Sequence, residues 1–105
     1  MTPRWTLPIV AVLVSGMSVS ARAETVQISM ENLVISPAEA TAKVGDTIEW
    51  INKDIFVHTA TARNGDWDVT MPPKKTVTLV LKKAGTIDYY CRFHPNMKAT
   101  LTVGP

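Results

Sequence analysis

Apolar and polar residues alternate with a period of two in several short stretches of the chain. The alternation is clearest around Val26, Ile48, Val77, Ile87 and Leu101. It is typical of β-strands that place one face on a core and the other in water. No stretch keeps a helical apolar stripe for about ten residues, the usual length of a helix, and the only candidate for a single helical turn is residues 37–41.

Residues that favour turns separate these stretches, for example at Gly45-Asp46, Asn64-Gly65 and Pro72-Pro73. Strands with turn signals between them and no intervening helices are typical of a β-sandwich or a barrel. We therefore predict an all-β fold, a β-sandwich of about seven or eight strands.

The N-terminal part of the chain differs from the rest. Arg4 provides a positive start, residues 7–14 form an apolar run, and Ala21-Arg22-Ala23 has the small residues of a cleavage site. This order is typical of a secretory signal peptide, and the apolar run is too short to span a membrane. We predict a signal peptide over residues 1–23, and a single exported domain over residues 24–105.

Charge excludes one broad class of function. The 105 residues include 11 Lys and Arg and 9 Asp and Glu, for a net charge of +2. Removal of residues 1–23 takes away Arg4 and Arg22 but no acidic residue, which leaves nine basic and nine acidic side chains. A nucleic-acid-binding protein would show a basic excess, so we expect no nucleic-acid partner.

The chain has one cysteine and two histidines. Cys91 has no partner for an internal disulfide, so in an exported protein it is an intermolecular bridge, a reactive thiol or a metal ligand. His94 and Met97 follow Cys91 at intervals of three residues. Cys91 also shares the apolar face of Ile87, so we expect its sulfur to point into one end of the core. The other histidine, His58, lies in a second β-rich segment, residues 56–60.

These side chains form a set that suits copper. Two His and one Cys in a trigonal arrangement, with a weak axial Met, make the copper geometry of electron-transfer proteins. Zinc competes for such ligands, but structural zinc sites use Cys and His and not Met. We therefore predict one copper ion bound by His58, Cys91, His94 and Met97. A ligand on a separate strand would hold one geometry for Cu(I) and Cu(II), so little would move when an electron arrives.

The same residues carry a resemblance to a known family. Ser36-Pro37, residues 42–52, His58 and residues 85–97 are together similar to the cupredoxins, or type 1 blue copper proteins, and in particular to their amicyanin and pseudoazurin branches. The short Cys-x-x-His-x-x-Met loop is similar to that of the amicyanin branch. The resemblance implies a Greek-key β-sandwich with a type 1 copper at the four positions above. It also implies a monomer that shuttles single electrons in the periplasm between redox partners, such as a dehydrogenase or a cytochrome c.

One position departs from the family pattern. Many cupredoxins carry an asparagine directly after the first histidine ligand, whereas this chain has Thr59. The resemblance therefore implies that the hydrogen bond between the two ligand segments is made here by a hydroxyl group or by the backbone.

Several other residues have simpler interpretations. We expect Trp50 in the core rather than in an electron relay, and Tyr89 and Tyr90 to divide between core and surface. Because His94 lies within the loop, its ring edge should reach the surface inside an apolar patch for transient partners. The patch would comprise Phe93 and Pro95, with Pro72 and Pro73 as further candidates.

Three functions stay open at this point. An electron carrier is favoured, and a copper carrier or storage protein would use the same ligands but release the metal readily. A copper enzyme needs further histidines for a catalytic ion with an open position. Both histidines of this chain are already assigned, so we expect no enzymatic activity.

Overall fold

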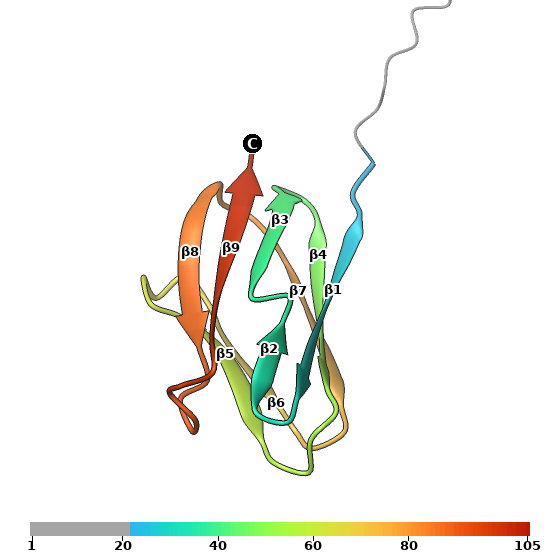
Figure 1. Cartoon of the computed structure of the whole chain (residues 1–105). Coiled ribbons are helices and arrows are strands. Elements are labelled where there is room, and N and C mark those ends of the chain that lie inside the picture. Colours follow the sequence, from blue (N-terminus) through green and yellow to red (C-terminus); the bar gives the residue numbers. More distant parts are fainter. Residues whose placement is uncertain (1–21) are drawn as a thin grey trace, which may run out of the picture.

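The structure is a computed structural model that describes residues 22–105, and within them it contains nine strands and no helix (Figure 1). The strands are β1 (Thr25–Glu31), β2 (Val34–Ser36), β3 (Glu39–Lys43), β4 (Thr47–Asn52), β5 (His58–Ala62), β6 (Asp68–Met71), β7 (Thr76–Val80), β8 (Gly85–Tyr90) and β9 (Lys98–Gly104). The all-β prediction is confirmed, with nine strands in place of seven or eight. The predicted signal peptide, apart from its last two residues, lies outside the described part of the chain.

Two sheets pack face to face (Figure 1). One sheet has the strand order β2-β1-β4-β7 and the other has the order β3-β9-β8-β5-β6. The pairs β1–β4 and β3–β9 are parallel, and the remaining pairs are antiparallel. Because the chain passes from one sheet to the other several times, neighbouring strands are often distant in sequence, which gives the expected β-sandwich.

Two local expectations are wrong. The segment considered for a helical turn, residues 37–41, contributes instead to β3, which pairs with β9. The inward positions of β3 are Ala40 and Ala42, and alanine offers too little apolar surface for the alternation to stand out. In addition, β5 begins at His58, so Phe56 and Val57 lie in the preceding loop, where both are exposed.

The core contains the apolar faces that the alternation predicts. Trp50 is fully buried, and its ring lies 5.8 Å from the ring of Tyr89 and 5.3 Å from that of Trp67. Trp50 Nε1 donates a hydrogen bond to the Tyr89 hydroxyl at 3.4 Å. Burial raises the pKa of Tyr89 to about 12, although this hydrogen bond acts in the opposite direction. Tyr89 is buried and Tyr90 half-buried, as expected from their opposite orientation along the strand.

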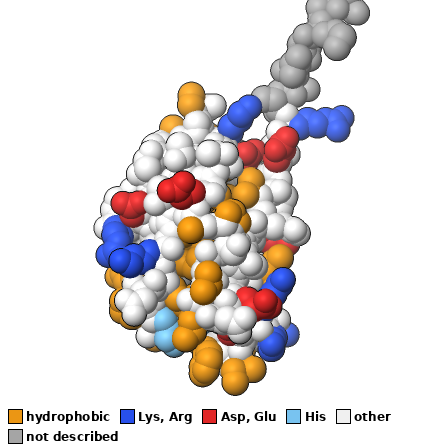
Figure 2. All heavy atoms as spheres, viewed as in Figure 1, with side chains coloured by type: hydrophobic (Ala, Val, Ile, Leu, Met, Phe, Trp, Pro, Cys, Tyr) orange, Lys and Arg blue, Asp and Glu red, His pale blue; other side chains and the backbone are white. Residues whose placement is uncertain are grey.

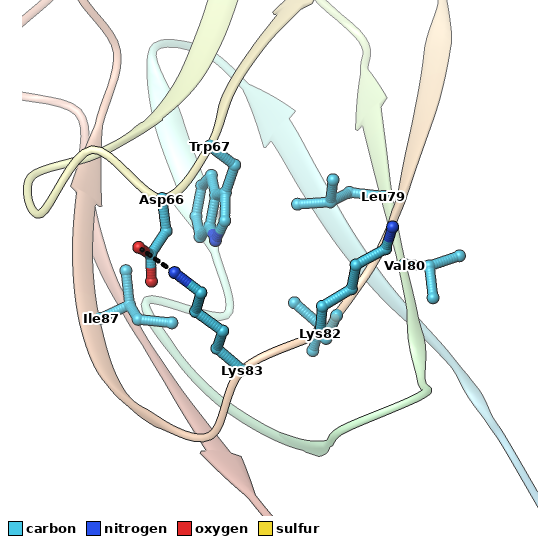
Figure 3. Close-up of a pocket in the computed structure, with 8 residues that line it drawn as sticks. Asp66, Trp67, Leu79, Val80, Lys82, Lys83 and Ile87 are labelled. Carbon is cyan, nitrogen blue, oxygen red and sulfur yellow. Dashed lines mark ion pairs between the residues drawn. The ribbon is translucent and has the colours of Figure 1, made fainter.

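A cavity of about 290 Å³ opens beside β7, at an edge of the sandwich (Figure 3). The ring of Trp67 lies against it, and an ion pair between Lys83 and Asp66, at 3.5 Å, lies at its rim. Its lining contains none of the four predicted metal ligands.

Four connections gather at one end of the sandwich, the lower end in Figure 1. They are the β1–β2 turn, the β4–β5 loop (53–57), the β6–β7 loop (72–75) and the β8–β9 loop (91–97). This end holds the three predicted ligands that have nitrogen or thiol donors. Within residues 22–105, no helix has the length and apolar character needed to cross a membrane.

Candidate metal centre

Three of the four predicted ligands meet at this end. Cys91 Sγ lies 3.7 Å from His58 Nδ1 and 3.8 Å from His94 Nδ1, and all three donor atoms lie within 4.8 Å of one another. The side chains of His58 and Cys91 are fully buried, and that of His94 is half-buried. The group therefore has one edge near the surface and two ligands inside the core.

The Cys91–Met97 loop closes on itself through its backbone. Cys91 N donates to Met97 O at 3.0 Å, and Met97 N donates to His94 O at 2.9 Å. Met97 is 2% exposed and belongs to the same core cluster as Cys91. The loop thus begins and ends with a buried sulfur-containing side chain, and it carries His94 between them.

Asp54 orients the ring of His58. Asp54 Oδ2 lies 2.8 Å from His58 Nε2. An ionised carboxylate can only accept, so Nε2 carries the ring proton and the lone pair of Nδ1 faces Cys91. A second hydrogen bond of this kind sets the tautomer and the orientation of histidines that bind metals.

Asp54 also binds the β1–β2 turn. Its carboxylate accepts hydrogen bonds from Asn32 N at 2.7 Å and from Leu33 N at 3.0 Å. Asn32 and Leu33 have positive φ angles of 53° and 62°, as in the tight turns of β-hairpins. Burial favours a higher pKa for Asp54, but the hydrogen bonds from His58, Leu33 and Asn32 outweigh it and hold the pKa below its usual value. The carboxylate therefore stays ionised at neutral pH.

Asn52 joins two of the loops at this end. It is 1% exposed, and its Nδ2 lies within hydrogen-bond distance of the carbonyl oxygens of Phe56, Met71 and Pro72. Its Oδ1 accepts from Asp54 N at 3.0 Å. Asn52 thus fixes the loop that contains Asp54 against the end of β6.

Thr59 joins the two segments that carry the ligands. Its hydroxyl accepts a hydrogen bond from Arg92 N at 2.9 Å, and its own backbone N donates to Cys91 Sγ at 3.4 Å. The expectation that a hydroxyl group or the backbone joins the two segments at this position is confirmed, since Thr59 uses both. Hydrogen bonds to a ligand sulfur are among the features that tune the potential of such a site.

Exposed apolar side chains lie on the loop that carries His94 and on the β4–β5 loop, whose Phe56 lies beside it. The ring of Phe56 lies 5.8 Å from that of His94, and Phe93 is 55% exposed. In Figure 2, exposed histidine atoms lie beside hydrophobic side chains at the lower end of the molecule. We call this surface the apolar rim; its members are Ile55, Phe56, Val57, Phe93 and Pro95. The exposure expected for Phe93 and Pro95 is confirmed, and the β4–β5 loop adds three members that the sequence patterns did not indicate.

The two sulfur–nitrogen separations fit a trigonal metal site. Ligands at about 2.0–2.3 Å from an ion in a trigonal arrangement lie about 3.6 Å from one another, which is close to the 3.7 and 3.8 Å separations from the sulfur. One thiol and two imidazole nitrogens suit copper or zinc, and His58, Cys91 and His94 are therefore grouped for metal binding.

Sequence patterns did not single out Asp54 or Asn52 as part of the site. A carboxylate four residues before a candidate histidine ligand was the available signal. It was weak, because Asp54 lies among residues that also favour an ordinary turn.

Comparison with known proteins supports the same kind of site. A family model described as a cupredoxin-like domain matches residues 5–103. The amicyanin of Paracoccus denitrificans is 35% identical over 71 residues, which cover 62% of this chain and 54% of that protein. The amicyanin of Paracoccus versutus is 25% identical over 87 residues, which cover 77% of this chain and 66% of that protein. The matches thus span less than two thirds of the length of either amicyanin.

Solved structures agree with this comparison. A structure described as the reduced Cu(I) form of an amicyanin variant at pH 4 superposes with a TM-score of 0.66 at 27% sequence identity. The match covers 75% of this chain and 81% of that one.

Proposed function

The chain belongs to the cupredoxin-like family, and from this premise we propose that it is a copper protein that carries single electrons. One copper ion would be bound by His58, Cys91, His94 and Met97. The observation that carries the proposal is the position of the two Nδ1 atoms, 3.7 and 3.8 Å from the sulfur of Cys91. That arrangement brings all three donor atoms within 4.8 Å of one another.

The donor set favours copper over zinc. A thiolate and two imidazoles suit both metals, but a thioether is a ligand for copper and not for structural zinc. Met97 is buried and lies at the end of the loop that begins at Cys91. The similar amicyanin structure is described as a Cu(I) form, which agrees with this choice.

The predicted ligands come from two different parts of the fold. His58 begins β5, while Cys91, His94 and Met97 lie on the β8–β9 loop. Asp54 fixes the ring of His58, and Thr59 fixes the start of the loop. When bound, copper supplies a one-electron couple between Cu(I) and Cu(II). Because the fold holds these residues, they would keep one geometry in both states.

Electrons would enter and leave through His94 and the apolar rim. His94 is the ligand nearest the surface, and Phe56 and Phe93 beside it are 49% and 55% exposed. Small exposed apolar surfaces suit transient contacts between redox proteins, which bury less area than stable complexes. The partners would be redox proteins such as a dehydrogenase or a cytochrome c, and the carrier itself would be a monomer.

The proposed electron carrier would be located in the periplasm and would catalyse no reaction. Residues 1–23 would direct export to the periplasm, where the signal peptide is removed. The full chain has two histidines, and both are assigned to the copper. A catalytic copper needs other ligands and an open position, so the proposal assigns no enzymatic reaction.

Release of Cu(I) separates an electron carrier from a copper-storage protein. The copper-loaded protein is reduced with ascorbate, and a high-affinity Cu(I) chelator is added in excess. For an electron carrier we expect release over hours, together with a reversible one-electron wave in voltammetry. Complete transfer of copper to the chelator within seconds would instead support copper storage.

A further inference from the structure

A chain of hydrogen bonds leads from the metal centre to the surface. Arg92 N donates to the hydroxyl of Thr59 at 2.9 Å. The hydroxyls of Thr59 and Thr61 lie 2.9 Å apart, and the Thr61 hydroxyl donates to Asp68 Oδ1 at 2.7 Å. Thr59 is fully buried, Thr61 is half-buried and the Asp68 side chain is 50% exposed. This series of hydrogen bonds therefore connects the Cys91–Met97 loop to a carboxylate on β6.

The number of available protons shows that these hydrogen bonds all run in one direction. Each hydroxyl has a single proton, and Thr61 uses its proton for the carboxylate of Asp68. Thr61 must therefore accept from Thr59, which leaves Thr59 Oγ1 free to accept from Arg92 N. All donors point toward Asp68, and aligned hydrogen bonds of this kind strengthen one another.

Asp68 holds Arg92 in a second way. The side-chain Nε of Arg92 lies 3.3 Å from both oxygens of Asp68. The hydrogen bond from Thr61, followed by that from Arg92, holds the pKa of Asp68 below its usual value against the opposing effect of burial. One ionised carboxylate thus binds the Arg92 side chain directly and its backbone N–H through two hydroxyls.

We propose that Thr61 and Asp68 are positioning residues that hold the Cys91–Met97 loop against β5 through the hydroxyl of Thr59. The proposal rests on the proposed copper site, since it concerns the loop that carries three of its ligands. It goes beyond that site because neither Thr61 nor Asp68 contacts a ligand side chain in the contacts described above.

The chemistry of a threonine at position 59 explains why these further hydrogen bonds are needed. An asparagine amide has separate donor and acceptor atoms, whereas a hydroxyl has one proton and rotates freely. Without a fixed acceptor for its proton, the Thr59 hydroxyl would not be held with its lone pair toward Arg92 N. Thr61 supplies that acceptor. Asp68 accepts the proton of the Thr61 hydroxyl, so Thr61 cannot donate it to Thr59.

The test compares three variants at Thr61 and Asp68 with the unaltered protein. Thr61→Val and Asp68→Ala interrupt the chain, whereas Thr61→Ser keeps the hydroxyl. In the metal-free protein, we expect Thr61→Val to speed hydrogen exchange of the Arg92 amide about fivefold or more, the effect of roughly one net hydrogen bond. In the copper-loaded protein, we expect release of Cu(I) to a chelator to become about tenfold faster, since loss of supporting contacts costs metal sites 10–100-fold in affinity.

A matched control lies on the same sheet. Thr100 Oγ1 donates to Asp88 Oδ1 at 2.8 Å, an exposed pair of the same chemistry that is not connected to the ligand loop. Asp88→Ala should change neither readout, and Thr61→Ser should restore both. The proposal is overturned if the Arg92 amide of Thr61→Val exchanges its hydrogen as slowly as that of the unaltered protein. It is also overturned if Asp88→Ala changes the two readouts as much as Thr61→Val does. If the unaltered protein binds no copper, the proposed function fails. The amide-exchange measurement still decides whether the hydrogen bonds through Thr61 and Asp68 position the loop.

Discussion

The imidazole of His58 lies between a carboxylate and a thiol: its Nε2 is 2.8 Å from Asp54 Oδ2, and its Nδ1 is 3.7 Å from Cys91 Sγ. One side of the ring is therefore occupied by a hydrogen bond, and the other faces the predicted copper position. Because the same carboxylate binds the β1–β2 turn, the turn and the metal centre share one support.

Loss of Asp54 should weaken metal binding and folding together. We expect Asp54→Ala to lower copper affinity about 10–100-fold, because supporting partners of this kind orient the histidine ligand. The metal-free variant should also lose about 2 kcal/mol of unfolding free energy, since several hydrogen bonds to a charged group disappear. Competition with a chelator and urea unfolding measure the two effects. Glu31→Ala removes an exposed carboxylate nearby and serves as the control; equal effects of both variants would contradict the assignment.

A charge in the apolar rim should slow electron exchange between copies of the protein. We expect Phe93→Glu to lower the rate of electron self-exchange by at least about tenfold, because two like charges are brought together when two rims meet. Nuclear magnetic resonance line widths in mixtures of the Cu(I) and Cu(II) forms measure this rate. Val80 is 51% exposed and lies on β7, away from the rim, so Val80→Glu is the control. An unchanged rate in Phe93→Glu would remove the rim from the path of the electron.

Trp50 should be among the residues most important for stability. Its side chain is fully buried and contacts the rings of Trp67 and Tyr89. We expect Trp50→Ala to lower the free energy of unfolding by about 3–5 kcal/mol, and Trp50→Phe to lower it less. Thermal and urea unfolding of the metal-free protein measure the change. A loss below about 1 kcal/mol in Trp50→Ala, the size expected at the surface, would contradict the packing described for the core.

Asp46 should contribute stability that disappears in acid. Its carboxylate accepts hydrogen bonds from Glu24 N at 2.9 Å and from Lys43 N at 2.8 Å. These bonds, the first more than the second, hold the pKa of Asp46 below its usual value of 3.8. A group whose pKa is lower in the folded state stabilises the fold above its unfolded pKa, and this contribution is lost as the pH falls through the folded pKa.

The measurement for Asp46 is unfolding of Asp46→Asn at several pH values. We expect the variant to be less stable than the unaltered protein at about pH 6, and the difference to shrink below about pH 4, where the carboxyl group of the unfolded chain is protonated. Asp88→Asn is the control, because the carboxylate of Asp88 accepts a hydrogen bond from the side chain of Thr100 and not from these backbone groups. A difference that stays constant down to about pH 2 would contradict this role.

The strands were predictable where large apolar side chains alternate with polar ones. Ile28, Trp50, Ile87 and Leu101 are all buried as the alternation indicates. β3 was missed because its inward positions are alanines, and the loop before His58 was read as strand because Phe56 and Val57 favour strands. Local patterns describe how a segment would pack, but not whether the rest of the fold provides a partner for it.

The candidate metal donors His58, Cys91 and His94 could be picked out from the sequence, because soft and imidazole donors are so few in this chain. The residues that hold these donors in place could not be predicted in the same way. Asp54 binds backbone atoms of residues 21 and 22 positions earlier, and Thr59 binds Arg92, 33 positions later. Such contacts depend on which loops the topology brings to one end of the sandwich. The need for a substitute at Thr59 could be stated from the sequence, but its continuation through Thr61 to Asp68 required the structure.

A thiolate–copper bond at Cys91 is the central element of the proposed function. The measurement is the visible and electron paramagnetic resonance spectra of the metal-free protein after addition of about one equivalent of Cu(II), beside those of Cys91→Ala. The proposed site should give an intense blue absorption band from thiolate-to-copper charge transfer in the unaltered protein, and no such band in Cys91→Ala. Saturation with Cu(II) without such a band, or the same spectrum from both proteins, would contradict it.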